Sequence, residues 1–477
     1  MYKNPLINTT TTFQRIIQGD CIRVLKTLQE NSIDCVVTDP PYGIGFMGKD
    51  WDKSLPPKEA FEECFRVLKP GALAFVMSSP RQDVLWRMMA MLEEAGFELK
   101  QSFISWIYKS GFPKSYDVSK GIDKKLRLKR EIIGVKNNPR YHYGYEHSLK
   151  GEMMGHKYGV FKEVDGSKVG EISDPASDLA KKWDGWKSIA GLKPALECIL
   201  MVNKPLSEKT IIDNVLKWGT GAINVDATRI PFQSNNDFEN RKRGVLKSPP
   251  LGRNKIYGDM QEVNTDKYLT KKGRFPANLI ISDNALDDGR ITKSPSGKVR
   301  RQRNMGRTWS KDTCGLRSKP SDLAGYGDIG SPYRYFDLDA WFKHQGFLDV
   351  PKASKGERDK GLEELPFGIV EALHGSVDGS LNKRTKGSPS FAKNIHPTVK
   401  PIRLMAYLIE LGCPPNGVVL DPFLGPGTTM LASLKLHRSC IGIEIDPETC
   451  QIAKARIFPK DKILGGIKYE FQVFPSP

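Results

Sequence analysis

The chain has 477 residues, of which 39% are hydrophobic and 27% charged, so it can bury a substantial core and is expected to form about two or three domains. Its formal net charge of +18 favours a polyanionic partner, most often nucleic acid, although a basic surface that only aids solubility would give the same value. The sequence has no secretory pattern and no apolar run long enough to span a membrane, so we predict a cytoplasmic protein with no membrane partner. Its eight cysteines form no CxxC pair, so we predict no metal site.

The N-terminal third alternates strand and helix patterns. Because such alternation is typical of a sheet whose strands are mostly parallel, this region predicts an α/β domain. Strands are expected at 16–20, 33–38, 72–77 and 99–108, and helices at 21–28, 59–68 and 83–95.

The apolar strand at 33–38 runs directly into Asp39-Pro40-Pro41-Tyr42. Open α/β sheets bind their ligands at the carboxyl ends of strands, where these four residues would lie. An acceptor, two prolines with fixed carbonyls and a flat aromatic ring could grip a planar ring that bears an amine. The same residues are also compatible with a proline turn at the end of a strand, so the tetrapeptide alone leaves both interpretations open.

A second αβ pattern near the C-terminus indicates a cofactor site. A strand at 417–420 is followed by a glycine loop, Asp421 to Thr429, and the next strand, 440–445, ends near Glu444. Such an acid can accept hydrogen bonds from both ribose hydroxyls of a nucleoside. The loop lacks the Gly-Lys-Ser/Thr of a phosphate loop, and Asp421 would repel pyrophosphate. A nucleoside with a positive group fits better, which points to S-adenosylmethionine.

The long middle of the chain has little periodicity apart from a core strand at 193–204 and a weaker one at 275–281. We predict an α/β domain made of residues 14–110 and 395–460, an insertion at 111–192 and a basic insertion at 205–394. The family resemblance described below implies that the first is the catalytic domain and the last the target-recognition region. Basic side chains in the insertions could track phosphates, although each cluster is equally compatible with a solvated surface. The candidate DNA-binding residues are Lys114, Arg241, Lys242, Arg243, Arg300, Arg301 and Arg303.

Three motifs in this order resemble the β-group of site-specific DNA amino-methyltransferases. They are the tetrapeptide Asp39-Pro40-Pro41-Tyr42, the segment His396-Pro397-Thr398-Val399-Lys400-Pro401 and the loop Asp421-Pro422-Phe423-Leu424-Gly425-Pro426-Gly427. The resemblance implies a seven-stranded, Rossmann-like α/β methyltransferase sheet with a long inserted target-recognition region, and S-adenosylmethionine as the cofactor. Further segments resemble a bacterial and phage subgroup of these enzymes: Ser110 to Ser115, Lys193 to Glu197, Gly219 to Asp226 and Lys352 to Arg358.

The resemblance also implies roles for single residues. Asp20 would contact the adenine of the cofactor, Phe423 would pack beside its adenine or methionine part, and Glu444 would hold its ribose. Thr398 and Lys400 would anchor its methionine carboxylate. The remaining cofactor-binding candidates are Asp421, Pro422, Gly425 and Gly427. Pro426 departs from the small residue that is usual in this loop and removes one N–H that could contact the cofactor.

The implied reaction moves a methyl group to the amine of a flipped base in double-stranded DNA. Tyr42 would stack on the base, and Pro41 would fix the loop. Asp39 and the Pro40 carbonyl would accept hydrogen bonds from the two N–H groups of the amine. An aspartate at the first position is more usual for adenine N6, and cytosine N4 is the alternative. An RNA methyltransferase and an inactive DNA-binding protein also remain open. A homodimer and a separate restriction endonuclease are possible partners.

Overall fold

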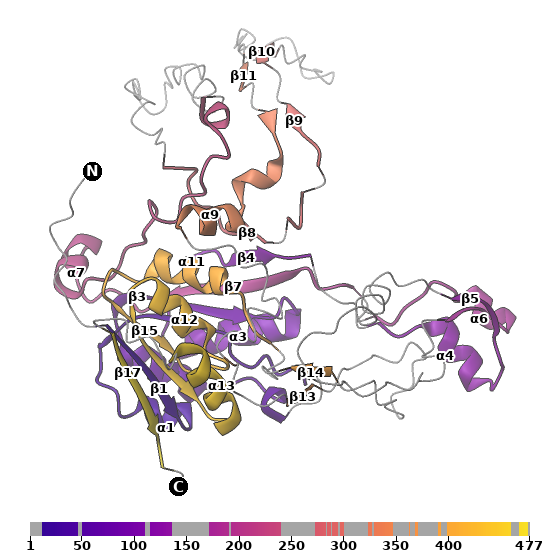
Figure 1. Ribbon diagram of the computed structural model, residues 1–477, viewed down its shortest axis with the longest axis horizontal. Helices are drawn as coiled ribbons and strands as arrows, with labels where there is room; N and C mark the ends of the chain where they lie inside the picture. Colours follow the sequence, from indigo (N-terminus) through magenta and orange to yellow (C-terminus); the bar gives the residue numbers. More distant parts are fainter. Residues whose placement is uncertain are drawn as a thin grey trace, which may run out of the picture. The chain divides into compact units, whose positions relative to one another are not determined.

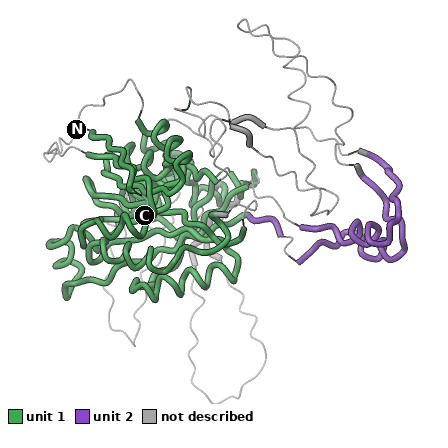
Figure 2. The backbone as a smooth tube through the Cα atoms, turned by 90° about the horizontal axis from the view of Figure 1, so that it is seen from below, with its two compact units in different colours: residues 1–110, 195–368, 392–477 green, residues 111–194, 369–391 purple. Residues whose placement is uncertain are grey.

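The computed structural model of the protein describes part of the chain. The described residues are 12–45, 50–109, 115–135, 171–189, 192–239, 272–282, 284–287, 289–293, 296–299, 323–326, 329–346, 362, 368–370, 390–392, 398–458 and 467–475. The chain divides into two compact units (Figure 2). The larger unit comprises Met1–Ser110, Ala195–Gly368 and Ala392–Pro477, and the smaller comprises Gly111–Pro194 and Ile369–Phe391.

A nine-stranded sheet forms the centre of the larger unit (Figure 1). All its described pairings are parallel except those of β7, which runs antiparallel to both neighbours. In spatial order the strands are β17 (Ile467–Val473), β1 (Thr12–Gln18), β16 (Ser439–Glu444), β15 (Val418–Asp421), β2 (Ile33–Thr38), β3 (Leu68–Ser78), β7 (Leu196–Asn203), β4 (Ile104–Ile107) and β8 (Leu279–Ile281). The predicted α/β class with a mostly parallel sheet is therefore confirmed.

Helices cover both faces of this sheet, because side chains alternate between the faces along each strand. On β2, Val36 packs in a core with α1 (Cys21–Leu25), α2 (Lys58–Val67) and α3 (Gln82–Glu94). Its neighbours Cys35 and Val37 pack in the other core, with α11 (Ile402–Gly412), α12 (Thr428–Lys435) and α13 (Pro447–Ile457). Burial on both faces explains why four of the six residues of β2 are apolar, the exceptions being Asp34 and Thr38.

The sheet has nine strands rather than the seven that the resemblance implied. One addition is β17, a half-buried edge strand that extends the sheet beyond β1. The other edge is β8, which comes from the predicted target-recognition insertion at 205–394 and pairs with β4. The same stretch supplies α9 (Leu338–His344), whose Trp341 ring packs 5.0 Å from that of Tyr407 on α11. Parts of that insertion thus complete the catalytic core.

The smaller unit contains α4 (Val118–Lys125), α6 (Asp178–Lys182) and the antiparallel pair β5 (Glu131–Val135) and β6 (Glu171–Asp174). Buried Asp123 ties the smaller unit together by accepting hydrogen bonds from the backbone N–H groups of Ala176 and Ser177.

The remaining described elements of the chain are η2 (Asp50–Asp52), α7 (Ile211–Trp218), β9 (Thr292–Lys293), β10 (Ser296–Val299), β11 (Leu323–Tyr326), β12 (Ile329–Gly330), η4 (Pro332–Tyr335), β13 (Gly368–Val370) and β14 (Ser390–Ala392). No helix in the described ranges is long and apolar enough to cross a membrane.

Candidate active site

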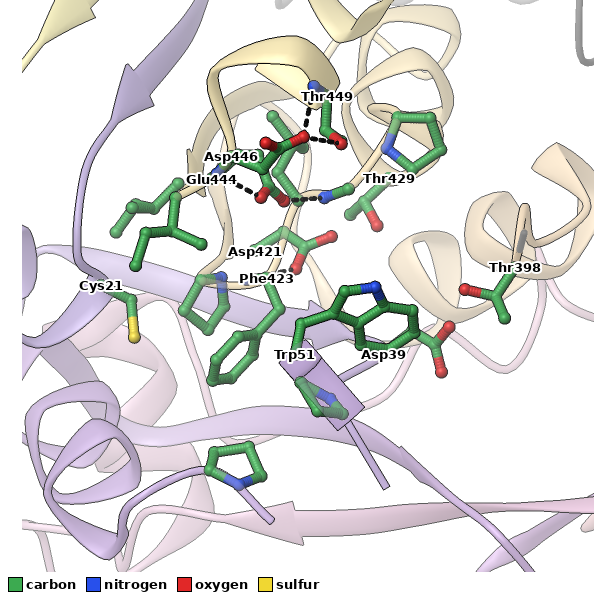
Figure 3. Close-up of a pocket in the computed structure, with 18 of the residues that line it drawn as sticks. Cys21, Asp39, Trp51, Thr398, Asp421, Phe423, Thr429, Glu444, Asp446 and Thr449 are labelled. Carbon is green, nitrogen blue, oxygen red and sulfur yellow. Dashed lines mark hydrogen bonds between the residues drawn. The ribbon is translucent and has the colours of Figure 1, made fainter. Parts of the chain in front are cut away.

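A cavity of about 580 Å³ lies where β1, β16, β15 and β2 end (Figure 3). It brings together most of the residues that the sequence singled out, although they come from opposite ends of the chain. Those on its wall are Asp20, Asp39, Pro41, Thr398, Lys400, Asp421, Pro422, Phe423, Gly425 and Glu444. Pro40, Tyr42 and Gly427 do not line it. Cys21, Trp51, Asp446 and Thr449 also line it and were not predicted.

Glu444 is held in place by backbone donors before any ligand arrives. Its Oε2 accepts a hydrogen bond from the N–H of Gly425 at 2.8 Å, and its Oε1 accepts one from the N–H of Asp446 at 2.9 Å. Burial raises the pKa of this carboxyl to about 7, against these two hydrogen bonds, which lower it. The acid therefore sits at the mouth of the glycine loop with its two oxygens fixed, as a ribose site requires.

Asp421 lies at the end of β15, beside the end of β2. Its Oδ1 accepts hydrogen bonds from the hydroxyl of Thr38 at 2.7 Å and from the N–H of Phe423 at 3.1 Å. Burial raises its pKa to about 6. Asp421 is only 2% exposed, and its carboxylate faces the cavity (Figure 3), so it places negative potential there and disfavours a phosphate.

The glycine loop needs its glycines for conformation and for space. Gly425 and Gly427 have φ of +53° and +83°, which L-residues with side chains rarely adopt. A Cβ on Gly427 would lie 2.6 Å from the side chain of Ile457. Pro426, the departure from the usual loop, is fixed through its carbonyl, which accepts a hydrogen bond from buried Arg456. The loop is therefore closely packed against α13 despite the proline.

The tetrapeptide is part of a buried cluster of charged and polar groups. Asp39 accepts a hydrogen bond on Oδ1 from the Tyr42 hydroxyl at 2.7 Å and one on Oδ2 from the Lys400 ammonium at 2.5 Å. The Lys400 nitrogen is also 3.4 Å from Oε2 of Glu197. Burial alone would lower the pKa of Lys400, but the carboxylates of Asp39 and Glu197 raise it above its ordinary value. Lys400 is therefore charged.

The position of Lys400 adds to what the resemblance implied. The methionine-carboxylate role was assigned to this residue, yet in the structure its ammonium contacts two carboxylates of the protein. An ammonium has three N–H donors, so these contacts are compatible with a third acceptor in the cavity that Lys400 lines. Thr398 lies on the same wall (Figure 3).

Asp52, which was not predicted as a site residue, fixes the backbone of the tetrapeptide. Its buried carboxylate accepts hydrogen bonds from the backbone N–H groups of Tyr42 at 2.7 Å and Gly43 at 3.0 Å. Its carbonyl accepts one from Gly45 at 2.7 Å. The neighbouring Trp51 is 42% exposed and lines the cavity, where Figure 3 shows it between Phe423 and Asp39. The short η2 segment thus holds one wall of the site.

Replacing Asp52 with Ala is expected to lower methyl transfer more than cofactor affinity, because two backbone N–H groups behind Asp39 would lose their acceptor. The free energy of unfolding should fall by about 1–3 kcal/mol. Denaturant unfolding, cofactor titration and turnover measure the three quantities. Asp178→Ala is the matched control, since that side chain is 99% exposed. Unchanged turnover in Asp52→Ala would show that the loop holds its shape without this carboxylate.

Lys114, Arg241, Lys242, Arg243, Arg300, Arg301 and Arg303 lie outside the described residues, as do His396 and Pro397 of the third motif. Their assigned roles remain predictions.

The sheet, the glycine loop with its distal acid and the tetrapeptide lie together as the sequence predicted for an α/β methyltransferase. The sequence model of the DNA methylase family matches residues 33–455, and the chain belongs to this family. Membership confirms the predicted class, a DNA amino-methyltransferase, and S-adenosylmethionine as the cofactor. It does not separate adenine N6 from cytosine N4 as the acceptor.

Individual relatives match shorter stretches. The type II methyltransferase M.HpaI of Haemophilus parainfluenzae is 34% identical over 110 residues, which are 21% of this chain and 34% of that protein. The type II methyltransferase M.SmaI of Serratia marcescens is 42% identical over 222 residues, 42% of this chain and 73% of that protein. Among solved structures, the cytosine-N4-specific PvuII DNA methyltransferase matches with a TM-score of 0.37 and 13% identity, covering 95% of this chain and 90% of that one.

Proposed function

We propose that the chain transfers the methyl group of S-adenosylmethionine to the N6 amine of an adenine at a specific site in double-stranded DNA. The observation that carries this proposal is the position of Asp39. Asp39 follows the last residue of β2 and lines the same cavity as Glu444 of β16 and Asp421 of β15. A group that can accept hydrogen bonds from an amine therefore lies beside a site suited to a nucleoside with a positive centre.

The residues present fit the cofactor. Glu444 would accept hydrogen bonds from the ribose hydroxyls, and Asp20, at the start of α1, would face the adenine. Phe423 offers an apolar ring on the same wall, and Thr398 with Lys400 would hold the methionine carboxylate. Asp421 supplies negative potential toward the cationic part. When bound, the cofactor supplies an electrophilic methyl group.

The chain's own contribution to the chemistry is positioning and charge. Asp39 and the carbonyl of Pro40 would accept the two hydrogens of the target amine and so direct its lone pair toward the methyl donor. Each carboxylate oxygen has two lone pairs, so the bonds from Tyr42 and Lys400 leave Asp39 able to accept another. Orientation of this kind can contribute about 7–11 kcal/mol. The carboxylate also stabilises the positive charge that develops on the nitrogen.

The adenine preference rests on the aspartate at position 39, which is more usual for adenine than for cytosine in these enzymes. The base would be extruded from the duplex and stacked on Tyr42, which is worth about 1–3 kcal/mol for comparable base–aromatic stacks. The net charge of +18 supports a nucleic-acid substrate. Sequence recognition is assigned to the basic insertion.

Sequencing DNA from cells that express the chain, with detection of modified bases, tests base and site together. The proposal predicts N6-methyladenine at one recurring sequence. N4-methylcytosine at a recurring sequence would instead establish the alternative acceptor. Unmodified DNA from cells that contain folded protein would contradict methylation of DNA.

A further inference from the structure

Glu197 is a half-buried acid of the larger unit to which no role has been assigned. It lies near the beginning of β7, opposite Trp106 on β4. Because β7 runs antiparallel to β3, its beginning lies at the edge where the parallel strands end. The side chain of Glu197 is 19% exposed. Its carboxylate reaches the tetrapeptide cluster from β7, which lies on the side of β2 opposite β15 in the strand order.

Among the residues that the structure describes, the carboxylate of Glu197 makes its polar contacts with groups around Asp39. Its Oε2 is 3.4 Å from the Lys400 ammonium and 3.4 Å from the hydroxyl of Tyr42. A second hydroxyl, that of Tyr108 just after β4, also hydrogen-bonds to it. The titratable and charged groups that face Glu197 are therefore Asp39 and Tyr42 after β2, Tyr108 after β4, and Lys400 before α11.

The net charge of this cluster determines how strongly it stabilises the positive charge that develops on the target amine. Lys400 is 2.5 Å from Asp39, so these two groups alone would form a neutral ion pair. A neutral pair gives little net stabilisation to a cation beside it, because attraction to one charge is offset by repulsion from the other. With Glu197 ionised, two carboxylates share one ammonium and the cluster carries a net charge of −1.

We propose that Glu197 is a positioning residue for methyl transfer: it shares Lys400 with Asp39 and so keeps the surroundings of the target amine negatively charged. The inference rests on the proposed function, since it assumes that an amine is methylated beside Asp39. Glu197 acts through Lys400 and Asp39 and does not itself touch the methyl group.

The titration of Glu197 gives the proposal a second consequence. Burial raises the pKa of Glu197, as does the charge of Asp39, while Lys400 lowers it, and the balance is upward. Protonation of Glu197 would make the cluster neutral. The rate of transfer should therefore fall as the pH decreases through the range in which Glu197 takes up a proton.

The test compares wild type, Glu197→Gln, Glu197→Asp and the control Glu94→Gln, whose side chain is 65% exposed on α3. Single-turnover rates of DNA methylation are measured across pH, and the cofactor Kd by calorimetry. We expect Glu197→Gln to lower the rate by about 10- to 100-fold and leave the Kd within about twofold. It should also remove the contribution of Glu197 to the acidic limb of the pH profile, so that only the part due to Asp421 and Glu444 remains. Glu197→Asp should recover part of the rate and keep an acidic limb.

A rate within twofold of wild type in Glu197→Gln, or an acidic limb identical to that of wild type, would overturn the role of Glu197. If Glu197→Gln does not fold, Glu197→Asp decides: a pH profile identical to wild type would overturn the proposal. Absence of transfer by the wild-type protein would contradict the proposed function itself, which is a different result from an active enzyme that is indifferent to Glu197.

Discussion

Replacing Asp39 with Ala is expected to abolish methyl transfer, a loss of at least about 10²–10³ in rate, while DNA binding survives. The variant removes the acceptor for the target amine and the negative charge nearest to it. Asp39→Asn, which keeps the size of the side chain, should lose a similar factor in rate. A neutral amide cannot balance the charge of Lys400, and its NH2 group, which only donates, would face either Lys400 or Tyr42 in place of an acceptor.

Three measurements separate chemistry from structure in these variants: single-turnover methylation, DNA affinity by fluorescence anisotropy and thermal unfolding. Asp178→Asn serves as the control, because it makes the same chemical change at a fully solvated position of the smaller unit. Parallel loss of methylation and DNA affinity would show that Asp39 supports the fold of the site and not the reaction.

Cofactor affinity is expected to weaken as the pH falls below about 7, the pKa of Glu444. The ionised carboxylate can accept hydrogen bonds from both ribose hydroxyls, whereas the protonated form has lost its charge and one acceptor site. Because the pKa lies above the ordinary value for Glu, protonation begins near neutrality. The Kd should rise by up to about tenfold for each pH unit below this pKa.

Calorimetric titration of S-adenosylmethionine between about pH 6 and about pH 8 measures this dependence. Glu444→Gln should bind the cofactor about 10- to 100-fold more weakly at the upper pH. Its Kd should also depend less on pH, and the dependence that remains should come from Asp421, whose pKa is about 6. Glu94→Gln should titrate like wild type. A wild-type Kd that does not change with pH would remove Glu444 from the ribose site.

The sequence alone predicted which candidate residues lie together wherever they belong to short motifs at strand ends. Asp39, Asp421 and Glu444 follow apolar runs directly, and the parallel pairing of β2, β15 and β16 brings such ends together. The alternation of strands and helices predicted the fold class for the same reason, since each element could be recognised from its own residues.

Residues that depend on long-range or loop geometry were not predicted as part of the site. Glu197 reaches the cluster only because β7 is antiparallel, and direction cannot be inferred from an apolar strand by itself. Asp52 acts through a turn that returns to the tetrapeptide ten residues later. The edge strand β8 and helix α9 lie in a stretch with little periodicity, so their place in the core depends on contacts with β4 and α11.

The most direct test uses purified protein, unmethylated double-stranded DNA and S-adenosylmethionine labelled on its methyl group. After the reaction the DNA is digested to nucleosides, and these are separated and counted. The proposed function predicts that the label is found in N6-methyladenine and that Asp39→Ala incorporates none. Label in N4-methylcytosine would contradict the proposed acceptor, and unlabelled DNA from protein that binds the cofactor would contradict methyl transfer to DNA.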